Sequence, residues 1–210
     1  MKITNLDHLG LVAGIIDEIG IESIINRRLG EHSSEKISSG KVVKAMIINA
    51  LGLGSSPLYL FSKFFEGKSI EHLIGKGVNP DDLNADKLGR VSDKLSARGT
   101  GEILIEVVGV KKYQIKTETS HLDATSFHVH GEYKSSEENE VGEPRAIKIT
   151  HGYSRDHRPD LKQFTMELIC SGDGELPLWM KMGDGNQSDQ KQFAQTIKEF
   201  KKTFEFSGLI

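Results

Sequence analysis

Residues 117–131, TETSHLDATSFHVHG, alternate in the way that is typical of a β-strand, yet an aspartate, Asp123, lies inside the segment. Aspartate is depleted in strands, and a carboxylate on a covered sheet face is costly unless another group compensates its charge. Alternation predicts that one face carries Asp123, Thr125, Phe127 and Val129, and that the other carries Leu122, Ala124, Ser126, His128 and His130. Because apolar residues occur on both faces, the pattern predicts a central strand that is covered on both sides.

Two kinds of partner commonly compensate a buried carboxylate such as that of Asp123. One is a buried arginine or lysine, and the other is a divalent metal ion. The residue pattern alone leaves a structural role and a metal-binding role for Asp123 open as alternatives.

The segments around and after this strand predict an antiparallel sheet followed by a helix. Residues 144–154, 160–172 and 175–183 also have strand character, and short polar connections between successive strands favour an antiparallel meander. A helix over about residues 189–203 then follows, starting at Ser188 or Asp189. Its apolar residues recur at helical spacing: Phe193, Ile197, Phe200 and Phe204. The first three are predicted to pack onto the sheet.

Residues 1–112 instead have the periodicity of helices, and we predict a domain boundary after residue 112. Asp7, Ser38 or Ser39, and Asn84 are predicted helix N-caps, and Gly20 and Gly30 are predicted helix ends. In the helix after Ser38, helical spacing predicts a buried stripe of Val42, Val43, Met46, Ile47 and Ala50. We therefore expect an α+β chain, with a helical accessory or DNA-binding type of domain at residues 1–112 and a sheet domain at residues 113–210.

Composition sets broad limits on the class of protein. The 210 residues are 37% hydrophobic and 27% charged, as in ordinary globular proteins. The formal net charge of -3 gives no global sign of nucleic-acid binding, although a local basic face is enough for it. A single cysteine, Cys170, and the lack of a secretion signal or a membrane-length apolar run predict a cytoplasmic protein that does not use a membrane.

Two stretches carry a resemblance to a known family: residues 122–133, LDATSFHVHGEY, and residues 149–189, which include GYSRDHRPDLKQ and GDGNQSD. They resemble the catalytic domain of bacterial insertion-sequence DDE transposases of the insertion-sequence-four group. The helical first half resembles the accessory domain of one branch of that group. The resemblance implies a ribonuclease-H-like mixed β-sheet with one helix, incomplete in this chain.

The family's chemistry, as the resemblance implies it, needs more than one carboxylate. Two aspartates and a glutamate hold two divalent ions, usually Mg²⁺, that activate water or a DNA 3′-hydroxyl for attack on a phosphodiester. By resemblance Asp123 is the first aspartate, a catalytic residue and a metal ligand, whereas Asp184 and Asp189 look like a turn residue and a helix cap. No later acid of the chain matches the second aspartate or the glutamate. We therefore expect an N-terminal part of a transposase that is inactive alone.

The loop between the second and third strand segments is the other candidate site. The resemblance implies that Arg155, His157, Arg158 and Lys162 lie near the active site or the DNA backbone, and arginine suits phosphate. The alternative is a solvated loop in which Arg158 pairs with Asp156 or Asp160. The expected partners are the DNA ends of an insertion sequence and a second copy of the chain.

Two rival hypotheses stay open. In the first, the chain is a transposase remnant that binds DNA or dimerises without catalysing a reaction. In the second, His128 and His130 share a strand face and bind a metal with a third ligand from among His121, Glu132 and His151.

Overall fold

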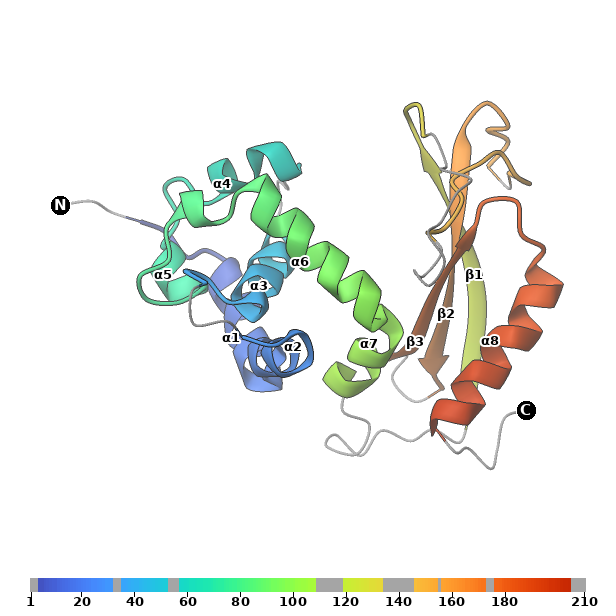
Figure 1. Cartoon of the computed structure of the whole chain (residues 1–210), viewed down its shortest axis with the longest axis horizontal. Helices are drawn as coiled ribbons and strands as arrows, with labels where there is room; N and C mark the ends of the chain where they lie inside the picture. The colour runs from blue at the N-terminus through green and yellow to red at the C-terminus, as the bar shows by residue number, and fades with distance from the viewer. Residues whose placement is uncertain are drawn as a thin grey trace. The chain divides into compact units, whose positions relative to one another are not determined.

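The computed structural model describes residues 4–31, 35–52, 57–108, 119–133, 146–154, 156–172 and 176–204. The chain divides into two compact units, residues 1–103 and 104–210. Figure 1 shows the helices of the first unit and the sheet of the second, with one long helix beside the sheet. The predicted α+β class is confirmed. The predicted domain boundary after residue 112 falls outside the described residues.

The N-terminal unit is built of short helices. These are α1 (Leu9–Ile19), α2 (Ile21–Leu29), α3 (Ser39–Ala50), η1 (Leu58–Leu60), α4 (Phe61–Phe64), α5 (Ile70–Leu73), η2 (Pro80–Asp82), α6 (Ala85–Arg98) and the start of α7 (Thr100–Val108). Helix α3 packs against α1, α2 and α6, so it forms the centre of this unit. None of the helices in the described ranges is long and apolar enough to cross a membrane.

Four of the predicted helix ends follow the expected chemistry, and one does not. Helices α1 and α2 end at Gly20 and Gly30. The Ser38 hydroxyl accepts the Lys41 N–H at 3.3 Å, and the Asn84 side chain accepts the Lys87 N–H at 3.0 Å. The predicted cap at Asp7 is wrong, because the N-cap residue of α1 is His8. Asp7 has a left-handed backbone, with φ of 47°, instead of the extended conformation that a capping residue adopts.

The buried face of α3 differs from the predicted stripe. Val42, Ala45 and Ile48 are fully buried, whereas Ala50 is exposed and the other three predicted residues are half-buried. The reason is the close approach of α2 to Gly40, where a Cβ atom would lie 2.4 Å from the carbonyl oxygen of Glu22. This contact turns the Gly40 side of α3 inward, a feature that hydrophobic periodicity does not report.

The C-terminal unit contains a three-stranded antiparallel sheet of order β1-β2-β3. Its elements are β1 (Ser120–Val129), β2 (Lys162–Ser171), β3 (Pro177–Asp184) and helix α8 (Asp189–Phe204). The predicted strand at residues 144–154 is wrong for its described part, where only Thr150 forms a bridge, to Gln163. Strands β1 and β3 already pair with the two edges of β2, so little of β2 is left for a further strand.

Helix α8 covers one face of this sheet. Phe200 is fully buried, and its ring lies 6.4 Å from the ring of Trp179 on β3. Phe193 and Ile197 are half-buried, so the predicted packing of the helix is carried mainly by Phe200. The covered face also holds polar residues, since the buried Thr196 hydroxyl of α8 donates a hydrogen bond to the buried Glu167 carboxylate of β2.

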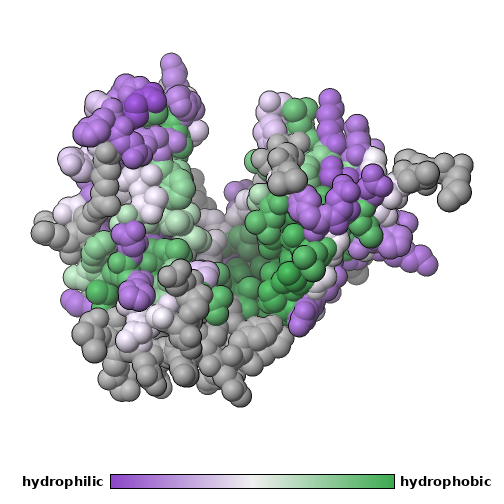
Figure 2. Space-filling model, turned by 180° about the vertical axis from the view of Figure 1, so that it is seen from behind, coloured by the Kyte–Doolittle hydropathy of each residue, from purple (hydrophilic) through white to green (hydrophobic). Residues whose placement is uncertain are grey.

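The opposite face of the sheet carries apolar side chains as well as Asp123, and it is partly open. The rings of Phe127 on β1 and Phe164 on β2 stack at 5.2 Å, and Phe127 and Met182 are both exposed. Figure 2, which views the chain from behind, shows hydrophobic residues at the surface of each unit beside hydrophilic ones.

Candidate functional site

Asp123 lies in the middle of β1, as predicted, but its surroundings differ from the prediction. It is opposite Leu168 of β2, and its side chain is exposed. Within the described ranges β1 pairs only with β2, so it is an edge strand of this sheet and not a central one. Because the carboxylate reaches solvent, the argument that it is a costly buried charge fails. No described residue forms an ion pair or hydrogen bond with it.

The residues around Asp123 do not form a metal centre. No group of three His, Cys, Asp or Glu side chains gathers anywhere in the described part of the chain. Asp184, at the end of β3, uses its carboxylate to accept the Lys148 N–H at 2.7 Å. One exposed carboxylate does not provide the several converging ligands that a two-metal site requires. The described residues therefore do not fit a pair of Mg²⁺ ions.

The candidate phosphate-binding loop lies at the far end of β1 from Asp123. Lys162 is opposite Val129, six residues along the strand from Asp123, which corresponds to about 20 Å. Lys162 donates through Nζ to the Tyr133 carbonyl at 2.6 Å. His157 is exposed, with φ of 55°, and Arg155 lies outside the described residues. The structure thus does not bring the described residues of this set, His157 and Lys162, to Asp123.

Arg158 has the internal partner that the alternative hypothesis predicted. Its guanidinium donates to both carboxylate oxygens of Asp160, at 2.9 and 2.7 Å. These hydrogen bonds lower the pKa of Asp160 to about 2, and the pKa of Arg158 is raised in turn. The positive charge that was predicted for phosphate is therefore already matched by a neighbouring carboxylate.

His128 holds this loop against the end of β1. Its Nε2 is 3.1 Å from the Ser154 hydroxyl, its Nδ1 is 3.4 Å from the Asp156 carboxylate, and Ser154 also accepts the Arg158 N–H at 2.8 Å. The order Asp–His–Ser resembles a hydrolytic triad, but Asp156 is 74% exposed and Ser154 also closes a local backbone turn. We read it as a loop-ordering contact. The rival metal site at His128 and His130 is wrong for the described residues, which contain no such cluster.

Two segments of the stretch 149–189, those around Gly152 and Gly185, meet at one place that sequence reasoning missed. A Cβ atom on Gly152 would lie 1.8 Å from the Gly185 carbonyl oxygen, so the two backbones touch where neither residue has a side chain. Between them, the buried Gln163 side chain donates to the carbonyls of Tyr153 at 3.2 Å and Gly185 at 2.8 Å. The glycines in HGYS and GDGN were the available signal, but nothing in the sequence pairs them.

A cavity of about 150 Å³ lies beside this contact. It is lined by Gly185 and by six polar residues, Ser126, Tyr153, Gln163, Thr165, Gln187 and Ser188. None of these residues is charged, and the Gln163 carbonyl oxygen has no hydrogen-bond donor among the described residues.

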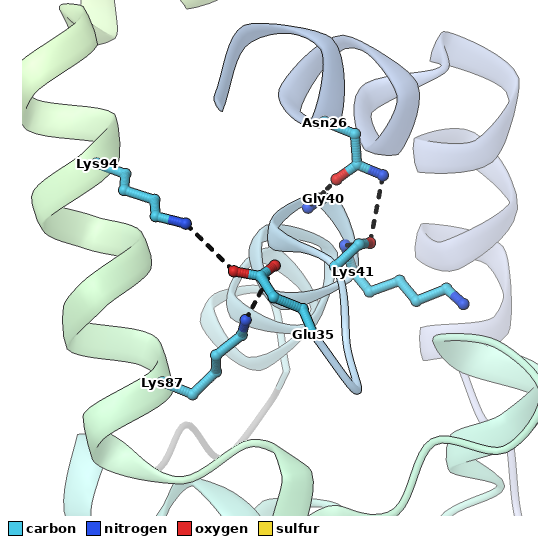
Figure 3. A network of polar contacts seen from close by, with 7 residues as sticks. Asn26, Glu35, Gly40, Lys41, Lys87 and Lys94 are labelled. Atoms are coloured by element: carbon cyan, nitrogen blue, oxygen red, sulfur yellow. Dashed lines mark hydrogen bonds and ion pairs between the residues drawn. The ribbon is translucent and has the colours of Figure 1, made fainter. Parts of the chain in front are cut away.

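The main polar network of the N-terminal unit is structural (Figure 3). Glu35 lies between Lys87 and Lys94 of α6, each with its Nζ 3.3 Å from a carboxylate oxygen. Burial opposes the ionisation of Glu35, but the two lysines outweigh it and hold the pKa of that carboxyl below its usual value. At the start of α3, Asn26 accepts the Gly40 N–H at 2.6 Å, so side chains of the unit itself satisfy this helix end.

Comparison with known proteins adds one finding. A family model described as "Domain of unknown function (DUF4277)" matches residues 1–109. No curated protein matches the chain, and no solved structure does. The match covers the helical unit and stops before the sheet that carries Asp123.

Proposed function

The chain belongs to the family described as a domain of unknown function (DUF4277), and for this member we propose a role in DNA transposition. The proposal assigns the C-terminal unit to a DDE catalytic domain of the insertion-sequence-four type, with a ribonuclease-H-like fold. Asp123 is its one recognisable metal-binding carboxylate. The N-terminal unit is the accessory domain that precedes it.

The observation that carries the proposal is the placement of Asp123. Three antiparallel strands are followed by an amphipathic helix on one face, and Asp123 lies mid-strand on the other face. Its carboxylate is exposed and has no cationic partner among the described residues. A carboxylate in that position is accessible to a hydrated ion and to a DNA strand, which supports the resemblance that the sequence suggested.

The proposal is limited by the number of ligands. Because the described residues supply one candidate ligand, no cleavage step follows from them, and we propose that the 210-residue chain binds DNA without cutting it. The electrostatic contribution to binding comes from local cations, since the net charge of the chain is -3. Such binding weakens as salt rises, because each neutralised phosphate releases condensed counterions.

Two assays on the 210-residue chain test the proposal. The first measures binding to a labelled DNA duplex as the salt concentration rises, and we expect an affinity that falls steadily with salt. The second measures nicking of supercoiled plasmid with Mg²⁺ or Mn²⁺, with Asp123→Ala as the control, and we expect no nicking by either chain. A chain that fails to bind the duplex even at low salt would refute the DNA-binding role. Nicking that the substitution abolishes would show that further residues complete the site.

A further inference from the structure

The cavity beside Gln163 is built by the stretches that most resemble the transposase family, yet it does not contain Asp123. Ser126 lines it and lies on the face of β1 that α8 covers, whereas Asp123 lies on the other face. The proposed metal-binding role of Asp123 therefore does not explain why this cavity is present. Its walls are held in place by other contacts. Backbone hydrogen bonds fix these walls. Thr150 and Gln163 exchange hydrogen bonds of 3.1 and 2.9 Å, and the Gly185 N–H donates to the Lys148 carbonyl at 3.0 Å.

The chemistry of the walls disfavours an anion. No charged residue lines the cavity. The Gln163 amide nitrogen is committed to two backbone carbonyls, so it is not free to donate to an anion. The side chains that line the cavity therefore offer a phosphate no positive charge.

The size and the rim of the cavity favour a small planar group. Its volume of about 150 Å³ is well above the roughly 10–15 Å³ of accessible space that holds one water molecule. That space suits a single ring and not a length of nucleic-acid backbone. Tyr153 lines the cavity and the residue is 84% exposed, so its aromatic ring is free to stack on a flat ligand.

We infer that this cavity binds the base of an unpaired nucleotide, with Tyr153 stacked on the base and the polar, uncharged walls facing its edge. The inference rests on the proposed function, which makes DNA the ligand. Bases carry N–H donors on their edges and stack on aromatic side chains without needing a cation, which matches the neutral walls and the exposed ring. The cavity thus recognises a base and leaves the phosphates to other parts of the chain.

The test compares two labelled single strands of about ten nucleotides, a length within the range of known single-strand sites. One strand carries cytosine at every position, and the other has the same sugar–phosphate backbone with abasic sites. We expect the 210-residue chain to bind the cytosine strand about tenfold more tightly, and Tyr153→Ala to remove that difference, since one base–aromatic stack accounts for an effect of this size. Tyr153→Phe keeps the ring and should bind like the parent chain. Tyr59→Ala is the matched control, because Tyr59 is 78% exposed and lies in the other unit.

Two outcomes would overturn the inference. In one, the parent chain binds the abasic and cytosine strands equally, which means that only phosphates are contacted. In the other, Tyr59→Ala weakens binding as much as Tyr153→Ala does. If duplex DNA is bound with the expected salt dependence while either outcome holds, only the base site is wrong. If neither duplex nor single strands bind, the proposed function fails with it.

Discussion

Phe200 is the side chain through which α8 is most firmly attached to the sheet, and its removal should destabilise the C-terminal unit. The residue is fully buried and its ring contacts that of Trp179 at a centroid distance of 6.4 Å. Truncation of a buried phenylalanine to alanine costs about 3–5 kcal/mol, because apolar contacts are lost and a cavity remains. With a slope of about 2 kcal/mol per molar urea for a unit of this size, the unfolding midpoint falls by roughly 2 M.

The assay is urea denaturation of Phe200→Ala, followed by far-ultraviolet circular dichroism and by the fluorescence of Trp179, the only tryptophan in the chain. Because Trp179 is in the C-terminal unit, its signal separates this unit from the helical one. Phe193→Ala is the matched control on the same helix, since Phe193 is half-buried and should cost clearly less. If the two variants unfolded at the midpoint of the parent chain, α8 would not be held by its apolar face, and the packing described above would be wrong.

Four further substitutions have outcomes that follow from the structure. Glu35→Gln should lower the unfolding free energy of the N-terminal unit by about 1–2 kcal/mol. Because the pKa of Glu35 is lowered on folding, its contribution is complete above the ordinary value of 4.5 and is lost as pH falls through the lower folded value, so parent and variant should converge in acid. Arg158→Ala should return the pKa of Asp160 from about 2 toward 3.8, measured by NMR titration, without changing stability, because both side chains are exposed. Gly152→Ala should cost about 2–4 kcal/mol, since its Cβ meets backbone, whereas Gly14→Ala in α1, where nothing lies within 4 Å, should stabilise by about 0.5–1 kcal/mol in denaturant unfolding.

Each of these expectations has a result that contradicts it. A Glu35 variant that differs from the parent equally at pH 7 and pH 3 would mean that its charge is not what stabilises the fold. An unchanged Asp160 titration would exclude the bidentate pair with Arg158 in solution. If Gly152→Ala and Gly14→Ala changed stability equally, the loops that contain Gly152 and Gly185 would not touch.

Local signals in the sequence predicted local structure well in this chain. Asn84 with the apolar residues after it located α6, and alternation placed the side chains of β1 on the correct faces. Alternation, however, tells which residues share a face and not whether anything covers that face. Asp123 was therefore predicted to be buried, although β1 has one strand neighbour in the described structure and the carboxylate reaches solvent.

Features that depend on distant residues were beyond the reach of pattern reasoning. The segment around Thr150 has strand composition, but β2 has two edges and both are taken by other strands, which no local window reveals. The contact between Gly152 and Gly185 joins residues that are 33 positions apart. The cavity beside this contact is likewise lined by residues that are distant in the sequence. For the candidate site, the sequence thus identified the position of Asp123 and the loop residues, but not the distance that separates them.

The pairing of β1 has a consequence for hydrogen exchange. In an antiparallel strand with one neighbour, alternate backbone amides point toward that neighbour and the others point away. Among the described residues β1 has β2 on one side only, so its amides should exchange with solvent deuterium in a period-two pattern from Ser120 to Val129. Strand β2, paired on both sides, should be protected at nearly every position. Any strand that added to the outer edge of β1, from this chain or another, would protect the fast-exchanging amides and leave the slow ones as they were.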